Sequence, residues 1–145
     1  MKHNAIRIIA MMLVLILAMN PLTVFATDFI EESSVEDSRA SNYISSTYAT
    51  VTNTNGRVEV YFRIIGTGTM NSIGAAQIQL MDSSGTTVKT FNYKTTSGMM
   101  SYSTYRHFGS VFYSGSASTR YTAIVTFQAS NNSGSDNRTF RATQP

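Results

Sequence analysis

The stretch RVEVYFRII, residues 57–65, decides the fold class of this chain. Its residues alternate between an apolar set (Val58, Val60, Phe62 and Ile64) and a more polar set (Glu59, Tyr61, Arg63 and Ile65). Successive side chains of a β-strand point to opposite faces, so this alternation predicts a strand with one buried face. Asn55-Gly56 directly precedes it, and this dipeptide favours a tight turn because both residues tolerate a positive φ.

The same pattern recurs outward from this strand. We predict strands at 48–52, 57–65, 75–81, 86–93, 107–113, 120–129 and 137–143. Turns rich in Ser, Asn and Gly separate them, and no helical period is found after residue 38. Seven short strands at this spacing predict an all-β, antiparallel sandwich or barrel that forms one domain over residues 39–145.

The first 26 residues have the three-part layout of a secretory signal peptide. Lys2 and Arg7 give a positive start, an apolar run of 12 residues covers 8–19, and small residues precede a cleavage site between Ala26 and Thr27. An uncleaved anchor would need about 20 apolar residues. We therefore expect a secreted, extracellular protein without a membrane anchor after cleavage.

Charge and cysteine content limit the chemistry of the remaining chain. Residues 27–38 form a short acidic segment that we expect to be a flexible arm, whereas 39–145 hold nine Lys or Arg and three acidic residues. A basic domain favours a protein or an anionic wall polymer as partner. No two basic residues are adjacent, so the alternative interpretation is that these charges serve ordinary solubility. We expect no nucleic acid as a partner. The chain has no cysteine, which excludes a thiol nucleophile, a thiolate metal site and a disulfide.

The strand 120–129 carries a resemblance to a known fold. The pattern Tyr121-x-Ala-x-Val-x-Phe-x-Ala-x-Asn-x-x-Gly134 resembles the penultimate strand of immunoglobulin-like and fibronectin type III-like sandwiches. This resemblance implies an immunoglobulin-like sandwich of about seven strands. Over 39–143 the chain also resembles a group of small secreted proteins of Gram-positive bacteria. The segments that carry this second resemblance are Tyr43–Thr47, Gly66–Met70, Ile73–Ala75 and Tyr121–Asp136. It implies no activity and no functional residues.

Catalysis has few candidate residues. His107 is the one histidine after residue 26, and a Ser-His-Asp triad would have to combine it with Asp82 or Asp136. Glycoside hydrolysis needs two carboxyl groups flanking the scissile bond, and metal sites need clusters of ligands that the sequence does not show. We therefore expect no catalytic residues, no cofactor, no metal and no enzymatic activity.

The stretch 94–108 is the longest predicted connection and the candidate partner-binding loop. Long loops are often functional, and Tyr, Met and Arg are enriched at interfaces. The candidate binding residues are Met99, Met100, Tyr102, Tyr105 and Arg106. In the alternative interpretation Met99, Met100 and Phe108 close one end of the sandwich.

Three functional hypotheses follow. The first is a non-enzymatic module that recognises a protein or a cell-wall glycan through its surface. The second is a structural or matrix protein that self-assembles through exposed edge strands. The third is a hydrolase that uses His107 as its base.

Overall fold

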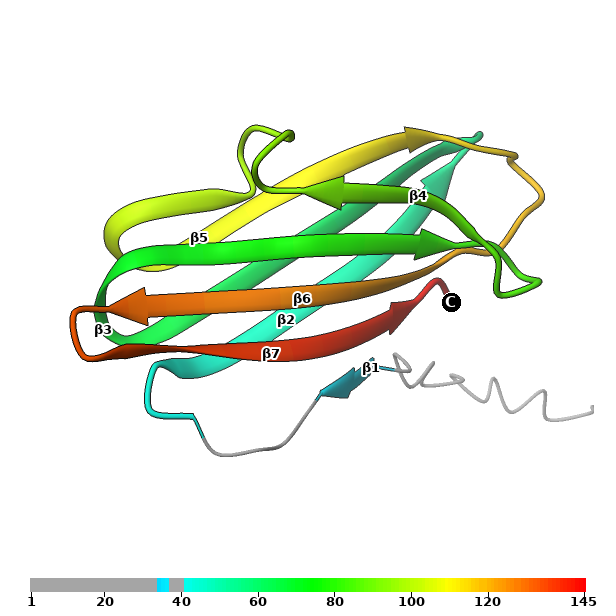
Figure 1. Cartoon of the computed structure of the whole chain (residues 1–145). Helices are drawn as coiled ribbons and strands as arrows, with labels where there is room; N and C mark the ends of the chain where they lie inside the picture. The colour runs from blue at the N-terminus through cyan, green and yellow to red at the C-terminus, as the bar shows by residue number, and fades with distance from the viewer. Residues whose placement is uncertain (1–33, 37–40) are drawn as a thin grey trace, which may run out of the picture.

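The computed structural model describes residues 34–36 and 41–145, and these form an all-β structure (Figure 1). The strands are β1 (Ser34–Glu36), β2 (Ile44–Thr54), β3 (Arg57–Met81), β4 (Thr87–Asn92), β5 (Met100–Ser114), β6 (Thr122–Asn131) and β7 (Gly134–Thr143). Every pairing between them is antiparallel. The predicted all-β class is therefore confirmed.

Most of the predictions for the N-terminal part of the chain concern residues outside those that the structure describes. The signal peptide, 1–26, and its cleavage site between Ala26 and Thr27 lie outside the described residues. Within the segment expected to be an arm, Ser34–Glu36 form β1 and pair with β7. No helix among the described residues has the length and apolar character needed to cross a membrane.

The 25-residue strand β3 organises the fold, because β2, β4, β5 and β6 all pair with it. Its first half, 57–66, lies between β2 and β5. Its second half, 70–81, pairs with β6 on one side and with β4 and the start of β5 on the other. Figure 1 shows the result as two layers that cross. The first layer holds β2, the first half of β3 and β5, and the second holds β4, the second half of β3, β6 and β7.

A corner at residues 66–69 carries β3 from one layer to the other. The register with β5 shifts between Ile65 and Met70. The Thr67 N–H donates to the Tyr43 carbonyl at 3.0 Å, and its hydroxyl donates to the Asn42 carbonyl at 2.7 Å. The prediction of two separate strands at 57–65 and 75–81 is therefore wrong. The polar residues between them lack a clear alternation, but they keep strand geometry because β5 and β6 pair with them.

The predicted loop 94–108 is also corrected. Its second half is the beginning of the 15-residue strand β5, with Met100 opposite Gly74 and Tyr102 opposite Ser72. The exposed polar and aromatic residues of this part hide the period of two, and Ser103 interrupts the strand with a φ of 54°. The remaining connection, 93–99, begins with a turn in which Asn92 accepts two backbone hydrogen bonds.

The core lies between the two layers. Phe62 of β3 and Phe127 of β6 are fully buried, with ring centroids 6.5 Å apart. The inward residues of the two strongest predicted strands, 58–64 and 121–129, are all buried as their alternation predicted. Tyr121 closes one end of the core, since its hydroxyl accepts a hydrogen bond from the Ser116 N–H at 2.9 Å.

Candidate functional site

The solvent-facing side of the first layer is the candidate site, and we call it the outer face. The alternation in 57–65 places every second residue of β3 on the solvent side. These outward residues lie opposite outward residues of β2 and β5, and together they form the face. Glu59, for example, lies opposite Thr52 on one side and Phe112 on the other. The outer face consists of Tyr48, Thr50, Thr52, Thr54, Arg57, Glu59, Tyr61, Arg63, Arg106, Phe108, Ser110 and Phe112.

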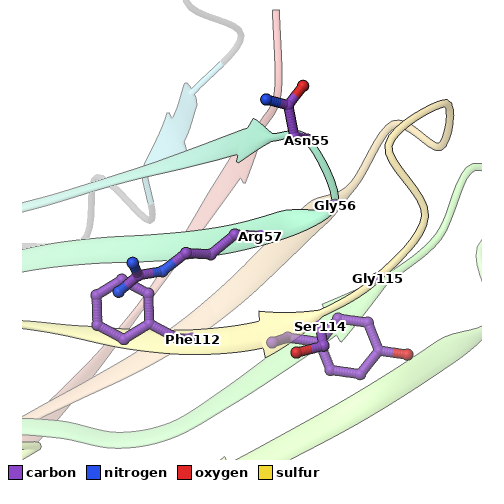
Figure 2. Close-up of a pocket in the computed structure, with 7 residues that line it drawn as sticks. Asn55, Gly56, Arg57, Phe112, Ser114 and Gly115 are labelled. Atoms are coloured by element: carbon purple, nitrogen blue, oxygen red, sulfur yellow. The ribbon is translucent and has the colours of Figure 1, made fainter.

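Arginines stacked on aromatic rings dominate this face. The Arg57 guanidinium carbon lies 4.4 Å from the centroid of the Phe112 ring, and Figure 2 shows the planar group over the ring. Arg63 lies 5.7 Å from the Tyr48 ring in the same way. A stacked guanidinium keeps the planar fork of N–H donors that matches carboxylate and phosphate groups. The face is therefore suited to bind anions beside aromatic surfaces.

Two hollows flank the Arg57–Phe112 pair. The first has a volume of about 450 Å³ and is lined by Asn55, Gly56, Arg57, Phe112, Tyr113, Ser114 and Gly115. The second has a volume of about 360 Å³ and is lined by Thr52, Thr54, Arg57, Glu59 and Phe112. Both hollows share the same cation and the same ring, so one extended ligand crossing the face would meet Arg57 and Phe112 from both sides.

Asn53 fixes the turn that forms one wall of the first hollow. Its side-chain oxygen accepts from the Gly56 N–H at 3.0 Å, and its amide donates to the carbonyls of Ser116 and Thr119. Gly56 has a φ of 87°, a conformation that glycine adopts without strain. The turn before Arg57 is therefore held in place from both ends.

Charge on the outer face is predominantly positive. Arg57, Arg63 and Arg106 are exposed, whereas Glu59 is the single acidic member of the set. The Glu59 carboxylate accepts a hydrogen bond from the Ser110 hydroxyl at 2.6 Å, which holds it against β5. The arrangement leaves the arginines as the dominant charges that a ligand would meet.

His107 lies on the opposite, buried side of β5. The Gly98 carbonyl lies 3.0 Å from His107 Nε2, and because a carbonyl can only accept, Nε2 carries the proton. Nδ1 then accepts a hydrogen bond from the Ser101 hydroxyl, with 2.7 Å between the oxygen and the nitrogen. This serine–imidazole pair has a backbone carbonyl where a triad has a carboxylate. The His107 ring also packs against the Phe62 ring, with 5.7 Å between the ring centroids. His107 therefore connects the backbone at Gly98 and the start of β5 to the core.

The other residues weighed for catalysis lie elsewhere. Asp82 lies in the β3–β4 turn, where it accepts hydrogen bonds from Ser84 and Thr86, and these bonds lower the pKa of its carboxyl. Asp136 lies on β7 opposite Ala129. Among the described residues, no group of three or more His, Asp or Glu side chains forms a cluster that would hold a metal ion.

The buried imidazole predicts a pH-dependent stability. Burial lowers the pKa of His107 below its ordinary value of 6.5, and the Gly98 hydrogen bond opposes that shift. The unfolded chain therefore takes up a proton first as the pH falls. We expect the free energy of unfolding to be fully retained above pH 6.5 and to decrease as the pH falls below it toward the folded-state pKa.

Urea unfolding at pH 7.5, 6.5 and 5.5 checks this expectation. A His107→Gln variant should lose the decrease over this range, although its overall stability is lower. An identical pH slope in the parent and the variant would show that another group causes the dependence. His3 is present in both proteins and cancels in the comparison.

The five predicted binding residues do not share one surface. Met99 is fully buried and belongs to the core, and Met100 is half-buried. Tyr102 is 66% exposed, Tyr105 is 49% exposed, and Arg106 stacks on Tyr105 at 5.5 Å. Of the five, Arg106 alone is part of the outer face. The alternative, in which three residues close one end of the sandwich, holds for Met99 but not for Phe108, which is 60% exposed.

Arg57 and Phe112 were not among the candidates from the sequence. Arg57 has the parity of the polar residues Glu59 and Arg63, and this is the signal that marks it as a surface residue. Phe112 is a large apolar residue, and its local sequence gives no sign that it faces solvent. Their contact depends on the register between β3 and β5, in which Arg57 lies opposite Ser114 and Glu59 opposite Phe112. That register becomes visible only in the folded chain.

Comparisons of the chain with protein-family models, with curated proteins and with solved structures found no match.

Proposed function

We propose that this protein is a secreted, non-enzymatic recognition module that binds an anionic cell-wall glycan on its outer face. The observation that carries the proposal is the Arg57–Phe112 pair between two hollows. The Arg57 guanidinium covers one face of the Phe112 ring, and the rest of this half-exposed ring offers apolar surface on which a sugar ring packs. The stacked guanidinium binds a carboxylate or phosphate with two parallel hydrogen bonds. The pair therefore combines the two contacts that an acidic glycan requires.

The surroundings of this pair favour a glycan over a protein segment. Thr52, Thr54 and Glu59 line the second hollow, and hydroxyl and carboxylate side chains of this kind bind hydroxyl groups of a ligand. The arginines along the face lie on β3 and β5, so a polymer with repeated negative charges would meet more than one of them. A single small ligand would use fewer of these contacts.

The proposal includes an immunoglobulin-like architecture and secretion through residues 1–26. Tyr121 stands directly before β6, the penultimate strand, and its hydroxyl bonds back to the Ser116 backbone, as in the tyrosine corner of immunoglobulin-like domains. Two antiparallel layers also support this architecture. The sharing of β3 by both layers departs from it.

Co-sedimentation with Gram-positive cell walls tests the proposed ligand. We expect the purified protein to bind walls, and we expect binding to disappear after chemical removal of their phosphodiester-linked polymers. Arg57→Gln and Phe112→Ala should each weaken binding by about tenfold or more, since a hydrogen-bonded charge contributes roughly 1.5–3 kcal/mol. Far-UV circular dichroism establishes that both variants are folded.

Lys89→Gln is the matched control for the charge change. Lys89 lies on β4 in the other layer, over the Phe91 ring at 5.8 Å, and its loss alters the net charge by the same amount. It should bind walls like the parent. Equal weakening by Lys89→Gln and Arg57→Gln would mean nonspecific charge attraction and would contradict a site on the outer face. Binding that survives polymer removal but is lost after protease treatment of the walls would identify a wall protein as partner instead.

A further inference from the structure

The edge of β5 is the most open strand edge in the described part of the chain. Among the described strands β5 pairs with β3 alone and has 15 residues, whereas β4, the other strand on that side, has six. Figure 1 shows both strands along the same margin of the molecule. On the opposite side, β1 pairs with three residues of β7, and the Tyr48 ring of β2 lies 6.3 Å from the Phe140 ring of β7. An uncovered edge offers N–H and C=O groups to another strand.

The side chains of β5 make this edge unusually apolar. The exposed large hydrophobic side chains of the described residues are Tyr102, Tyr105, Phe108 and Phe112, and all of them lie on β5. Proteins commonly protect edge strands with lysine, proline or a bulge. Between Thr104 and Ser114 the strand has no lysine and no proline, and its positive-φ residue, Ser103, lies before this stretch.

We propose that β5 pairs antiparallel with β5 of a second copy of this chain around a two-fold axis at Ser110. This register places Phe108 of each copy opposite Phe112 of the other. A two-fold interface requires such reciprocity, because each residue must meet its partner twice. Even-numbered residues of one β5 then lie opposite even-numbered residues of the other, and side chains at opposite positions point to the same side of a sheet. The outer faces of both copies therefore lie on the same side of one continuous sheet.

Charge along the strand fits a second copy in this register. Arg106 is the single Lys, Arg, Asp or Glu residue of β5, and it lies opposite Ser114 of the second copy. The two arginines are then eight residues apart along the paired strands, a separation of about 27 Å at ~3.4 Å per residue. At 0.15 M ionic strength charges this far apart are largely screened. The net positive charge of residues 39–145 opposes association at low salt, so the dimer should strengthen as salt is added.

The absence of cysteine from the chain allows a clean test by disulfide trapping. In full-length Ser110→Cys the two thiols lie directly opposite each other, within the Cα separation that a disulfide accepts, about 4.4–6.8 Å. Ser114→Cys is the matched control on the same strand, with its two thiols far apart. With oxidised glutathione, we expect a covalent dimer of Ser110→Cys and at least tenfold less of Ser114→Cys.

Sedimentation equilibrium of the parent chain gives an independent measurement. We expect a monomer–dimer equilibrium that stops at the dimer, tightens with salt, and weakens by about tenfold or more in Phe108→Ser, since both aromatic pairs are lost. A parent chain that stays monomeric at high concentration would overturn the proposal, and so would equal trapping at both cysteine positions. Open-ended growth of oligomers would also contradict a closed two-fold pair. Binding to cell walls weakens with salt, so failure of either proposal is distinguished from failure of the other.

Discussion

Replacing Phe62 with alanine is expected to lower the free energy of unfolding by about 3–5 kcal/mol. Phe62 is fully buried between the layers and contacts the rings of Phe127 and His107 at centroid distances of 6.5 and 5.7 Å. Alanine removes the apolar ring and leaves a cavity that neighbouring strands cannot fill without losing their pairing with β3. Natural domains have a total stability of about 5–15 kcal/mol, so this loss is a large part of it.

Urea denaturation followed by far-UV circular dichroism measures the change. Phe108→Ala is the matched control, since Phe108 lies 60% exposed on the outer face. At protein concentrations where the chain is a monomer, we expect this exposed substitution to alter stability by about 0.5 kcal/mol or less. Similar losses for the two variants would mean that Phe62 is not at the centre of the core.

Gly74→Ala is expected to destabilise the protein by about 1–3 kcal/mol or more, because the new methyl group has no space. A Cβ built on Gly74 meets the backbone of Met99 and lies 2.8 Å from the Met100 Cα. These atoms belong to the backbone and cannot turn away as a flexible side chain would. The start of β5 would have to move from β3, which would stretch the 2.8 Å hydrogen bond from the Ala75 N–H to the Met99 carbonyl.

Gly68→Ala is the control for this substitution. Gly68 belongs to the same strand, but a Cβ at its position meets no atom within 4 Å. Thermal unfolding of the two variants should therefore separate them, with the melting temperature of Gly68→Ala close to that of the parent. A loss of stability in Gly68→Ala equal to that in Gly74→Ala would show that chain flexibility, rather than steric contact, determines the effect.

The strands that could be predicted from sequence are those with one solvent-exposed face and one buried face. Alternation in 57–65 and 120–129 identified strands and their buried residues, because burial imposes the period of two. The first half of β5 gave no such signal: Tyr102, Ser103 and Tyr105 are all exposed, and this segment is a strand because β3 pairs with it. Pairing partners far away in sequence leave no local pattern.

The same reasoning explains how much of the candidate site was foreseen. Sequence alternation placed Glu59 and Arg63 on the solvent side, and their positions agree with it. The stacking of Arg57 on Phe112 depends on which strands are neighbours and in which register. Local sequence determines where a side chain points, whereas the long-range pairing determines what it contacts. The conformation of 94–108 was mispredicted for this second reason, because its second half is a strand that pairs with β3.

The continuity of β3 through both layers has a consequence for how the chain folds. Four strands pair with β3, and three of them, β2, β4 and β5, have no other pairing partner among the described strands. Each layer therefore contains one part of β3, and we expect neither layer to fold independently of the other. The two layers should gain and lose their structure in one cooperative step. Residues 57–81 take part in four of the six pairings between the described strands, and two of these four join strands that are not consecutive in sequence. Folding must therefore bring distant parts of the chain together before much stability is gained, which makes such folding slow.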